Sequence, residues 1–388
     1  MKMQIIHSWI LLLSITDNID AFQLHRVGHS LTHLSSNRAD SLHPTTIQAD
    51  TEVYDPIQHL YDMKWYVIGT PDEFSMSRPI KTTVWSNDYA VWKTAPNTYT
   101  ALANACPHRG ASFSDGVVTK DACIVCPYHG YEYTPKGTLT HVPGVPLTPS
   151  QYLKSYDATK YDVIEQDGWV YLNTFSYVSY NVTPGSLSNH LSKDVERTPD
   201  FTCNTMELDY DASPRLLTEN GLDISHIGFV HSFGNRESPC PIEENPPRQI
   251  GPNRYQTKYK YEAGAKSMAK MVFGQDMLNV ENEFVLPHMS IARVKFSKYI
   301  NTIITFATPI SYNKTRLYVK NYRNFWHNIF GDWLIRTTMD QTMREDRKVV
   351  EGIYEYAKDG KFNMRYDKLG NTYRVLYEKI YEKNRMHF

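Results

Sequence analysis

The fold of this 388-residue chain is decided by two short stretches, Cys106-Pro-His108-Arg-Gly110 and Cys126-Pro-Tyr-His129-Gly130. Each stretch offers one thiolate and one imidazole, and 17 residues (109–125) separate His108 from Cys126. Two thiolates can hold one iron and two imidazoles the other iron of a [2Fe–2S] cluster, which differs from an all-cysteine site. Pro and Gly beside the ligands are typical of tight turns. The sequence therefore predicts two β-hairpin tips that clasp a [2Fe–2S] cluster.

Other chemistries use the same residue types and define the alternatives. A Cys₂His₂ zinc site normally pairs Cys with Cys and His with His, whereas each half of this motif is mixed. Cys123 and Cys126 also form a C-x-x-C, which can be redox active in a βαβ context. The surrounding sequence favours β-hairpins, so we expect Cys123 to pack beneath the cluster loop. Cys203 and Cys240 show no ligand spacing and are expected to be structural.

A second group of candidate ligands lies in the stretch Glu219-Asn-Gly-Leu-Asp223-Ile-Ser-His226-Ile-Gly-Phe-Val-His231. Two histidines and one carboxylate form the facial triad of non-haem iron enzymes that activate O₂. We expect a helix from about Leu216 to Phe229, on which Asp223 shares a face with His226. His231 is five residues beyond His226, about 140° away on a regular helix. The helix must therefore bend or end near Gly228 for both imidazoles to reach one metal.

A third ligand must come from elsewhere, and a helix expected from about Asp332 to Ala357 offers Asp346. An ionised carboxylate that faces a core is costly unless it is paired or bound to a metal. The alternative is that Asp346 pairs with a buried Arg or His. The off-stripe residues Asp340, Glu345 and Glu351 are expected to be solvated. The apolar stripe that contains Asp346 has spacings of 4, 3, 4 and 3 residues and consists of Met339, Met343, Asp346, Val350 and Ile353.

The remaining sequence indicates two domains. Short β-branched and aromatic runs with Gly, Pro and Asn-Asp turns predict an all-β domain over residues 55–177. A Ser/Asn/Pro-rich stretch from Ser179 is the expected linker, and long strand-like runs with the two helical segments follow in residues 178–388. Lys plus Arg number 41 against 42 Asp plus Glu, a balance that gives no sign of nucleic-acid binding.

Residues 1–50 have the character of a targeting presequence. The apolar run Ile5–Ile15 is too short to cross a bilayer and fits a signal segment, and the Arg-, His- and Ser-rich stretch that follows Ala21-Phe22 is typical of a transit peptide. The combination resembles the bipartite plastid presequences of algae with secondary plastids. The alternative is an ordinary secretory signal. No later segment reaches the roughly 18 apolar residues of a membrane span, so we expect no span in the mature protein.

The chain resembles the Rieske non-haem iron oxygenase alpha-subunit superfamily from Lys64-Trp-Tyr-Val-Ile-Gly69 onward, and its phthalate-type and cyanobacterial or plastid members most closely, in residues 219–239 and in Arg344-Glu-Asp-Arg-Lys-Val-Val-Glu-Gly352. The resemblance implies an α+β fold class, with an all-β Rieske domain and a helix-grip catalytic domain. It implies Cys106, His108, Cys126 and His129 as cluster ligands, and His226, His231 and Asp346 as ligands of a mononuclear Fe(II). It further implies that Asp223 bridges the two metal sites between neighbouring subunits of a head-to-tail homotrimer.

These features predict an oxidoreductase that hydroxylates, demethylates or desaturates an apolar organic substrate with O₂. No G-x-G-x-x-G after a strand and no P-loop occurs in the sequence, so electrons are expected from an external ferredoxin or flavin reductase. One alternative is a chlorophyllide- or pheophorbide-type tetrapyrrole oxygenase. Pheophorbide-type members resemble one another in a late C-x-x-C and C-terminal membrane spans, whereas the last cysteine here is Cys240. The alternative of another class is a non-enzymatic Rieske electron carrier.

Overall fold

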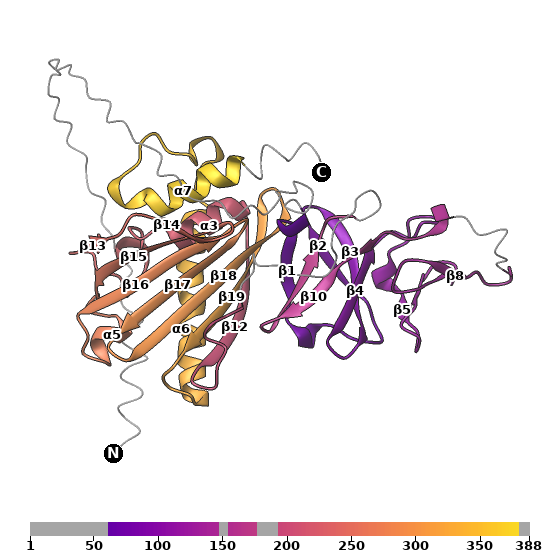
Figure 1. Cartoon of the computed structure of the whole chain (residues 1–388), viewed down its shortest axis with the longest axis horizontal. Coiled ribbons are helices and arrows are strands. Elements are labelled where there is room, and N and C mark those ends of the chain that lie inside the picture. Colours follow the sequence, from indigo (N-terminus) through magenta and orange to yellow (C-terminus); the bar gives the residue numbers. More distant parts are fainter. Residues whose placement is uncertain (1–60, 147–153, 177–192, 380–388) are drawn as a thin grey trace, which may run out of the picture. The chain divides into compact units, whose positions relative to one another are not determined.

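The computed structural model describes residues 61–146, 154–176 and 193–379 (Figure 1). The expected presequence, the expected linker at Ser179 and the boundary between residues 177 and 178 lie outside the described residues. Within the described ranges, no helix is both long and apolar enough to cross a lipid bilayer.

The N-terminal part is built from three small antiparallel sheets. The predicted run that begins at Trp65 forms β1 and pairs with β11. The strand order in the three sheets is β1-β11-β10, β2-β3-β4-β9 and β5-β6-β7-β8. The strand bounds are β1 (Trp65–Gly69), β2 (Ile80–Val84), β3 (Asn87–Ala95), β4 (Thr98–Ala103), β5 (Val117–Val118), β6 (Ile124–Val125), β7 (Glu132–Tyr133), β8 (Leu139–His141), β9 (Lys160–Tyr161), β10 (Val163–Gln166) and β11 (Trp169–Asn173).

One core of this part lies directly under the expected cluster loops. It combines Trp92 and Leu102 of β3 and β4 with Phe113, Ile124 and Tyr133, all of which are nearly or completely buried. Short 3-10 helices connect the strands at Pro71–Glu73, Phe113–Asp115 and Lys154–Tyr156. The four strands β5 to β8 span only two or three residues each, so aromatic packing beneath them must hold the loops in place.

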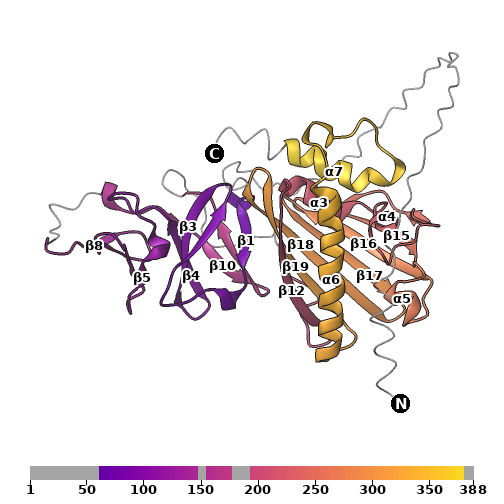
Figure 2. The same ribbon diagram turned by 180° about the vertical axis from the view of Figure 1, so that it is seen from behind.

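The C-terminal part is one eight-stranded antiparallel sheet covered by helices on one face (Figure 2). Its strand order is β12-β19-β18-β17-β16-β15-β13, with β14 also paired to β15. The predicted strand-like runs correspond closely to β15, β17 and β18. The strand bounds are β12 (Thr202–Tyr210), β13 (Glu243–Glu244), β14 (Arg248–Gly251), β15 (Arg254–Glu262), β16 (Met277–Val285), β17 (Met289–Phe296), β18 (Tyr299–Ser311) and β19 (Lys314–Arg323).

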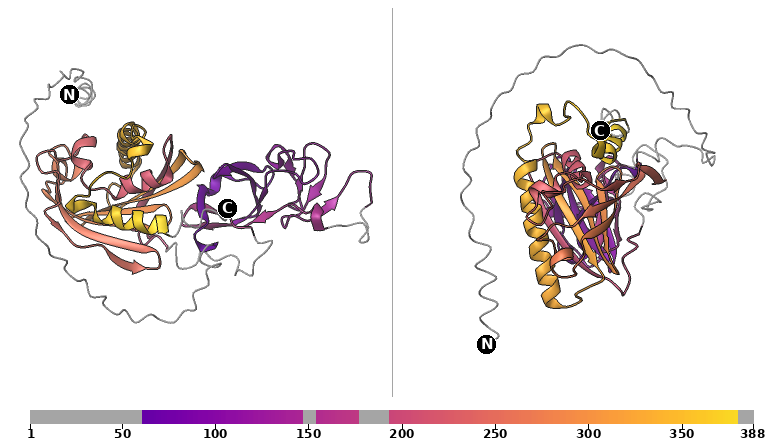
Figure 3. Two further views of the ribbon diagram at one scale, coloured as in Figure 1. Left: turned by 90° about the horizontal axis from the view of Figure 1, so that it is seen from above. Right: turned by 90° about the vertical axis from the view of Figure 1, so that its left-hand side faces the viewer.

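Five helices belong to the described C-terminal part: α3 (Pro214–Leu222), α4 (Ile227–Val230), α5 (Met268–Met271), α6 (Ile329–Val350) and α7 (Lys368–Tyr377). Short 3-10 helices lie at Glu355–Ala357 and Arg365–Asp367. Helix α6 runs along one side of the sheet (Figure 3) and buries Ile335, Met343 and Val350 toward it. Met343 and Val350 pack with Leu217 of α3 and Val319 of β19, which fixes both helices against the same face.

The predicted bounds of both helical segments were wrong. Helix α6 begins at Ile329, three residues before the predicted start, because the Asn328 side chain accepts the N–H of Gly331 (2.8 Å) as an N-cap. It ends at Val350, before Gly352, so Ile353 is outside the helix and 41 % exposed. The predicted helix 216–229 is two helices, α3 and α4, separated by residues 223–226.

Candidate metal centres

The two expected cluster loops share one backbone conformation. In the first loop, the Cys106 N–H donates to the carbonyl five residues later (2.9 Å), and the Gly110 N–H donates to the Cys106 carbonyl (2.8 Å). In the second loop, Cys126 and Gly130 make the same two bonds at 2.9 and 3.0 Å. Gly110 and Gly130 have φ values of 73° and 70°, in the left-handed region that favours glycine. The repeated C-P-x-x-G pattern therefore encodes the same turn twice.

These turns bring together the four residues expected to hold the cluster. Cys106 and Cys126 are 3 % and 2 % exposed, whereas His108 and His129 lie at the surface with ring centroids 4.7 Å apart. Tyr131 stacks on the His108 ring at 4.6 Å and 10°. Two buried thiols beside two exposed imidazoles fit a cluster with one thiolate-bound and one imidazole-bound iron.

Tyr133 is a further residue of the cluster site that the sequence reasoning missed. Its hydroxyl lies 3.7 Å from the Cys106 sulfur, and its side chain is 1 % exposed. Burial raises the pKa of Tyr133, and the nearby Cys106 raises it further. The hydroxyl therefore stays protonated and can donate a hydrogen bond to the sulfur. Hydrogen bonds to cluster sulfurs are one way in which a protein tunes the reduction potential. The residue is 27 positions from Cys106, a separation without a recognisable pattern.

The second expected site is also assembled in the fold. His226, His231 and Asp346 present donor atoms that all lie within 4.8 Å of one another. Asp346 Oδ1 is 3.5 Å from His226 Nε2 and 3.4 Å from His231 Nε2. The three side chains are 15 %, 4 % and 17 % exposed, in the same order. The carboxylate from α6 thus meets two imidazoles from the α3–α4 region.

The donor set fits a metal ion better than an ion pair. Asp346 Oδ1 is buried and accepts no hydrogen bond from any described residue, although two ring nitrogens face it. A buried carboxylate oxygen that accepts no hydrogen bond costs free energy. Two imidazoles and one carboxylate around a common point are the facial ligand set that leaves coordination positions open on non-haem iron. The alternative, in which Asp346 pairs with a histidine, would involve His226 or His231, and these two residues are also the expected metal ligands.

The two histidines lie at the two ends of one short helix, because the chain leaves this helix just after Gly228. Helix α3 ends at Leu222, and Asp223 has extended backbone angles (φ −74°, ψ 129°). His226 then caps the start of the single-turn helix α4 and His231 caps its end. Their ring centroids are 5.2 Å apart. The end of α4 at Val230 agrees with the prediction that the helix bends or ends near Gly228, whereas the predicted shared helical face for Asp223 and His226 was wrong because α3 stops at Leu222.

Each of the two histidines has a carboxylate near its other ring nitrogen. Asp223 Oδ2 lies 3.7 Å from His226 Nδ1, and Glu345 Oε2 lies 3.1 Å from His231 Nδ1. Such carboxylates orient the ring and increase its strength as a ligand. Glu345 was expected to be solvated, but it is 22 % exposed and faces the site. Its position next to Asp346 was the only sequence signal that could have identified it.

Asp223 is the C-cap residue of α3 and lies shortly before the start of α4 at Ile227. Its Oδ1 accepts the Ser225 N–H (2.7 Å), and the side chain is 44 % exposed. A negative charge at a helix C-terminus is unfavourable. The dipole of α3 therefore does not stabilise the charge on Asp223.

The carboxylates also alter the proton affinity of the site. Burial by itself would lower the pKa of His226, but Asp223 and Asp346 outweigh burial and raise it to about 9. Burial would raise the pKa of Asp223, but His226 and the Ser225 N–H outweigh it and lower the pKa. A metal ion must therefore displace a proton from His226 when it binds.

Apolar side chains border the histidines on the sheet side. Ile224 is completely buried, and Ile227 packs with it against Tyr259 of β15, Val280 of β16 and Val294 of β17. This layer restricts the access of water to the triad from the sheet.

The other cysteines are not part of either site. Cys123 is half-buried, and its sulfur lies 3.9 Å from the carbonyl of Asp121. Burial, followed by the nearby Glu132, raises the pKa of Cys123, so its thiolate is disfavoured. Cys203 and Cys240 are exposed.

Comparisons with known proteins match both parts of the chain. The family model described as the Rieske [2Fe-2S] domain matches residues 64–157. The model described as the vanillate O-demethylase oxygenase C-terminal domain matches residues 210–383. The two matches contain all seven candidate ligands between them.

Individual relatives are distant. The chain is 24 % identical over 318 residues to chloroplastic pheophorbide a oxygenase of Oryza sativa subsp. japonica, covering 74 % of this chain and 56 % of that protein. It is 28 % identical over 176 residues to the oxygenase component of dicamba O-demethylase of Stenotrophomonas maltophilia, covering 43 % and 46 %. The chain thus spans about half the length of these curated relatives. A crystal structure of dicamba monooxygenase bound to 3,6-dichlorosalicylic acid has the same fold, with a TM-score of 0.69 at 21 % identity over 84 % of this chain and 98 % of that chain.

Proposed function

This chain belongs to the Rieske non-haem iron oxygenases, because a Rieske domain precedes an oxygenase C-terminal domain, and we propose that it oxidises an apolar organic substrate with O₂. The observation that carries the proposal is the presence of two separate donor sets in one chain. Cys106, Cys126 and the two loop histidines suit a [2Fe–2S] cluster. His226, His231 and Asp346 suit a single Fe(II).

When bound, the cluster would supply single electrons and the Fe(II) would activate O₂ for hydroxylation, demethylation or desaturation. The residues of the chain have distinct tasks in this proposal. Asp346 and the two histidines would hold the Fe(II), and this ligand set leaves coordination positions open for reactants. Asp223 and Glu345 orient the imidazoles from behind. The buried apolar layer around Ile224 and Val280 keeps water away and favours an apolar substrate.

We also propose a homotrimer that receives electrons from a ferredoxin or a flavin reductase. Asp223 is 44 % exposed while its Oδ2 faces His226, so one side of the carboxylate is open to another chain. In a head-to-tail trimer, the cluster of one subunit would approach this open side. The cluster histidines are exposed as this arrangement requires.

The second candidate function is oxidation of a tetrapyrrole. It is favoured by the similarity to chloroplastic pheophorbide a oxygenase, which extends over 74 % of this chain. The same likeness supports a plastid location directed by residues 1–50, with secretion as the alternative. A fluorescent reporter fused to residues 1–46 should enter the plastid in an alga with complex plastids, whereas a reporter found in the medium would refute this location.

Metal content and O₂ consumption test the proposed function. The reconstituted protein should hold about three irons per chain, two in the cluster and one in the triad. With reduced ferredoxin, it should incorporate ¹⁸O₂ into, or desaturate, one member of a panel of methoxylated aromatics, sterols and tetrapyrroles. A protein that holds two irons and consumes no O₂ with any member would instead be an electron carrier.

A further inference from the structure

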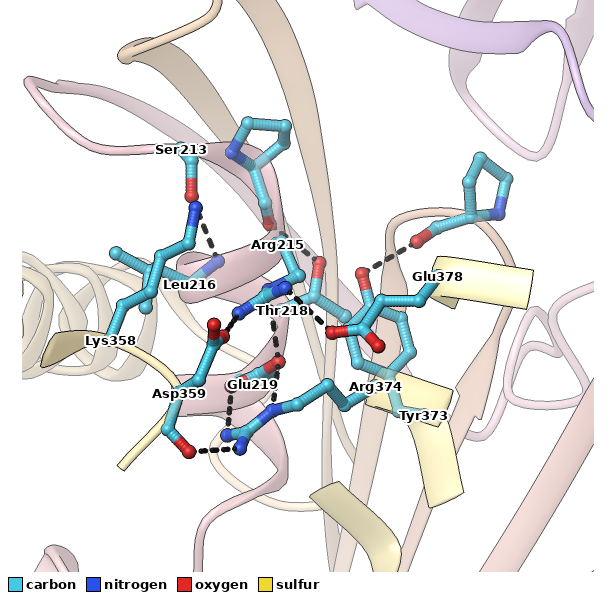
Figure 4. A network of polar contacts seen from close by, with 12 residues as sticks. Ser213, Arg215, Leu216, Thr218, Glu219, Lys358, Asp359, Tyr373, Arg374 and Glu378 are labelled. Atoms are coloured by element: carbon cyan, nitrogen blue, oxygen red, sulfur yellow. Dashed lines mark hydrogen bonds and ion pairs between the residues drawn. The ribbon is translucent and has the colours of Figure 1, made fainter. Parts of the chain in front are cut away.

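Helix α3, which leads into the iron motif, is tied to the C-terminal helix α7 by a group of charged residues (Figure 4). Arg374 of α7 binds Glu219 of α3 through two nitrogens, with Nη2 at 2.7 Å and Nε at 3.1 Å from the two carboxylate oxygens. Two-point pairs of this kind are stronger and better defined in direction than single contacts. The Glu219 side chain is 11 % exposed, so water screens the pair only weakly.

Arg215, one turn earlier on α3, completes the charged group. Its side chain is 5 % exposed, and its Nε lies 3.3 Å from Glu219 Oε1. It also contacts Glu378 Oε1 at 3.1 Å and pairs with Asp359. Arg374 Nη1 donates to the backbone carbonyl of Asp359 at 2.8 Å. Two arginines thus join α3, the segment before α7 and the end of α7 in one geometry.

The backbone of Glu219 also connects this residue to the metal site. Its carbonyl accepts the N–H of Asp223 (3.0 Å), the residue at which the chain leaves the helix. Asp223 Oδ2 then lies 3.7 Å from His226 Nδ1. A single hydrogen bond therefore separates the residue held by α7 from the carboxylate that faces the iron histidine.

The opposite side of the same helical turn is held by the sheet. Asn282 Nδ2 of β16 lies 3.4 Å from the carbonyls of Gly221 and Leu222. A Cβ atom at Gly221 would lie only 2.5 Å from Ser290 Oγ of β17, so the helix approaches the sheet as closely as glycine allows. With the sheet on one side and Arg374 on the other, the last turn of α3 has little freedom to tilt.

We propose that Arg374 and Glu219 are positioning residues for the iron site, because their ion pair sets the last turn of α3 and thereby Asp223 and His226. Neither residue touches the three candidate ligands, and their effect passes through the backbone. The inference rests on the proposed function, since it requires the triad to hold a metal.

The test is Co(II) binding to protein with an intact cluster whose mononuclear site has been emptied with a chelator. Loss of a group that orients a metal ligand directly costs roughly 10- to 100-fold in affinity. The Arg374–Glu219 pair acts at one remove, so Arg374→Gln is expected to weaken Co(II) binding about three- to tenfold and to shift the Co(II) absorption bands. The visible spectrum of the cluster should be unchanged. Glu219→Gln should give a similar loss, and the double variant no larger loss, because both changes break the same interaction.

The matched control is Arg316→Gln in β19. Arg316 also binds a carboxylate through two nitrogens, at 2.6 and 3.0 Å from the oxygens of Asp209, and its side chain is 36 % exposed. This variant should retain the Co(II) affinity and spectrum of the wild type, whatever its Tm. An Arg374→Gln protein that loses only thermal stability and keeps both Co(II) properties would overturn the inference alone, provided that the wild type binds one Co(II). A wild type that binds no Co(II) would overturn the proposed function and the inference together.

Discussion

Replacement of Glu345 by alanine should weaken iron binding at the triad without affecting the cluster. The carboxylate lies 3.1 Å from His231 Nδ1, within reach to accept a hydrogen bond from that nitrogen and so to favour the tautomer that presents Nε2 to a metal. Gln341 Nε2 holds the other carboxylate oxygen at 2.9 Å and contacts Ser232 at 3.2 Å. Glu345→Ala removes both the proton acceptor and its charge.

The size of the effect follows from the exposure of the two groups. Carboxylates behind metal-bound histidines contribute roughly 10- to 100-fold to metal affinity. Glu345 is 22 % exposed and partly screened, whereas the His231 side chain that it faces is only 4 % exposed. We therefore expect a loss of about tenfold, or about 1.4 kcal/mol, for Glu345→Ala. Glu345→Gln retains an acceptor oxygen and should lose less.

The assay is anaerobic competition for Fe(II) between the protein and a chromogenic chelator, with the cluster spectrum recorded in the same sample. Asp340→Ala is the control, because Asp340 also lies on α6. Among the residues that the structure describes, it pairs only with the exposed Arg344 (2.7 Å). Glu345→Ala with an Fe(II) affinity within about twofold of the wild type, or with an effect equal to that of Asp340→Ala, would refute the reasoning.

Four further predictions concern the two metal centres and the core. His108→Ala should abolish the visible spectrum and the reduced-state EPR spectrum of the cluster. If the variant keeps both spectra, His108 is not a cluster ligand. Asp346→Ala should lose the mononuclear iron and keep the cluster spectrum; three irons and continued turnover would contradict its assignment. Asp223→Asn should keep both metals but leave the reduced cluster unable to pass its electron in a single turnover, so near-wild-type product formation would remove the bridging role. Burial, with a smaller contribution from Lys64, lowers the pKa of His288 in the folded protein to about 3. Between about pH 6.5 and pH 3 the unfolded chain therefore binds one more proton at this residue than the folded chain does. The free energy of unfolding consequently falls as the pH falls through this range. The free energy of unfolding of the wild type should decrease relative to that of His288→Gln by about 1.4 kcal/mol per pH unit below pH 6.5, and parallel pH profiles would contradict this.

The sequence by itself determined the chemistry of both donor sets. The turn that presents Cys106 or Cys126 is encoded within five consecutive residues, and both copies adopt the same hydrogen bonds. Strands such as β17 were readable because their aromatic and β-branched runs are local and continuous. Asp346 stood out because a carboxylate in an apolar helical stripe is costly without a partner. Each of these signals depends only on residue types and short spacings.

Tertiary structure alone decided how the iron site is built. The sequence predicted one helix over residues 216–229, but packing of Ile224 into the sheet-side core accompanies the break at Asp223. The partner of His231 is 114 residues away, and the partner of Glu219 is 155 residues away. No local pattern encodes such pairs, because their geometry depends on how α6 and α7 pack against the sheet. The candidate ligands were thus accessible from the sequence, whereas the groups that orient them emerged only when distant helices were brought together.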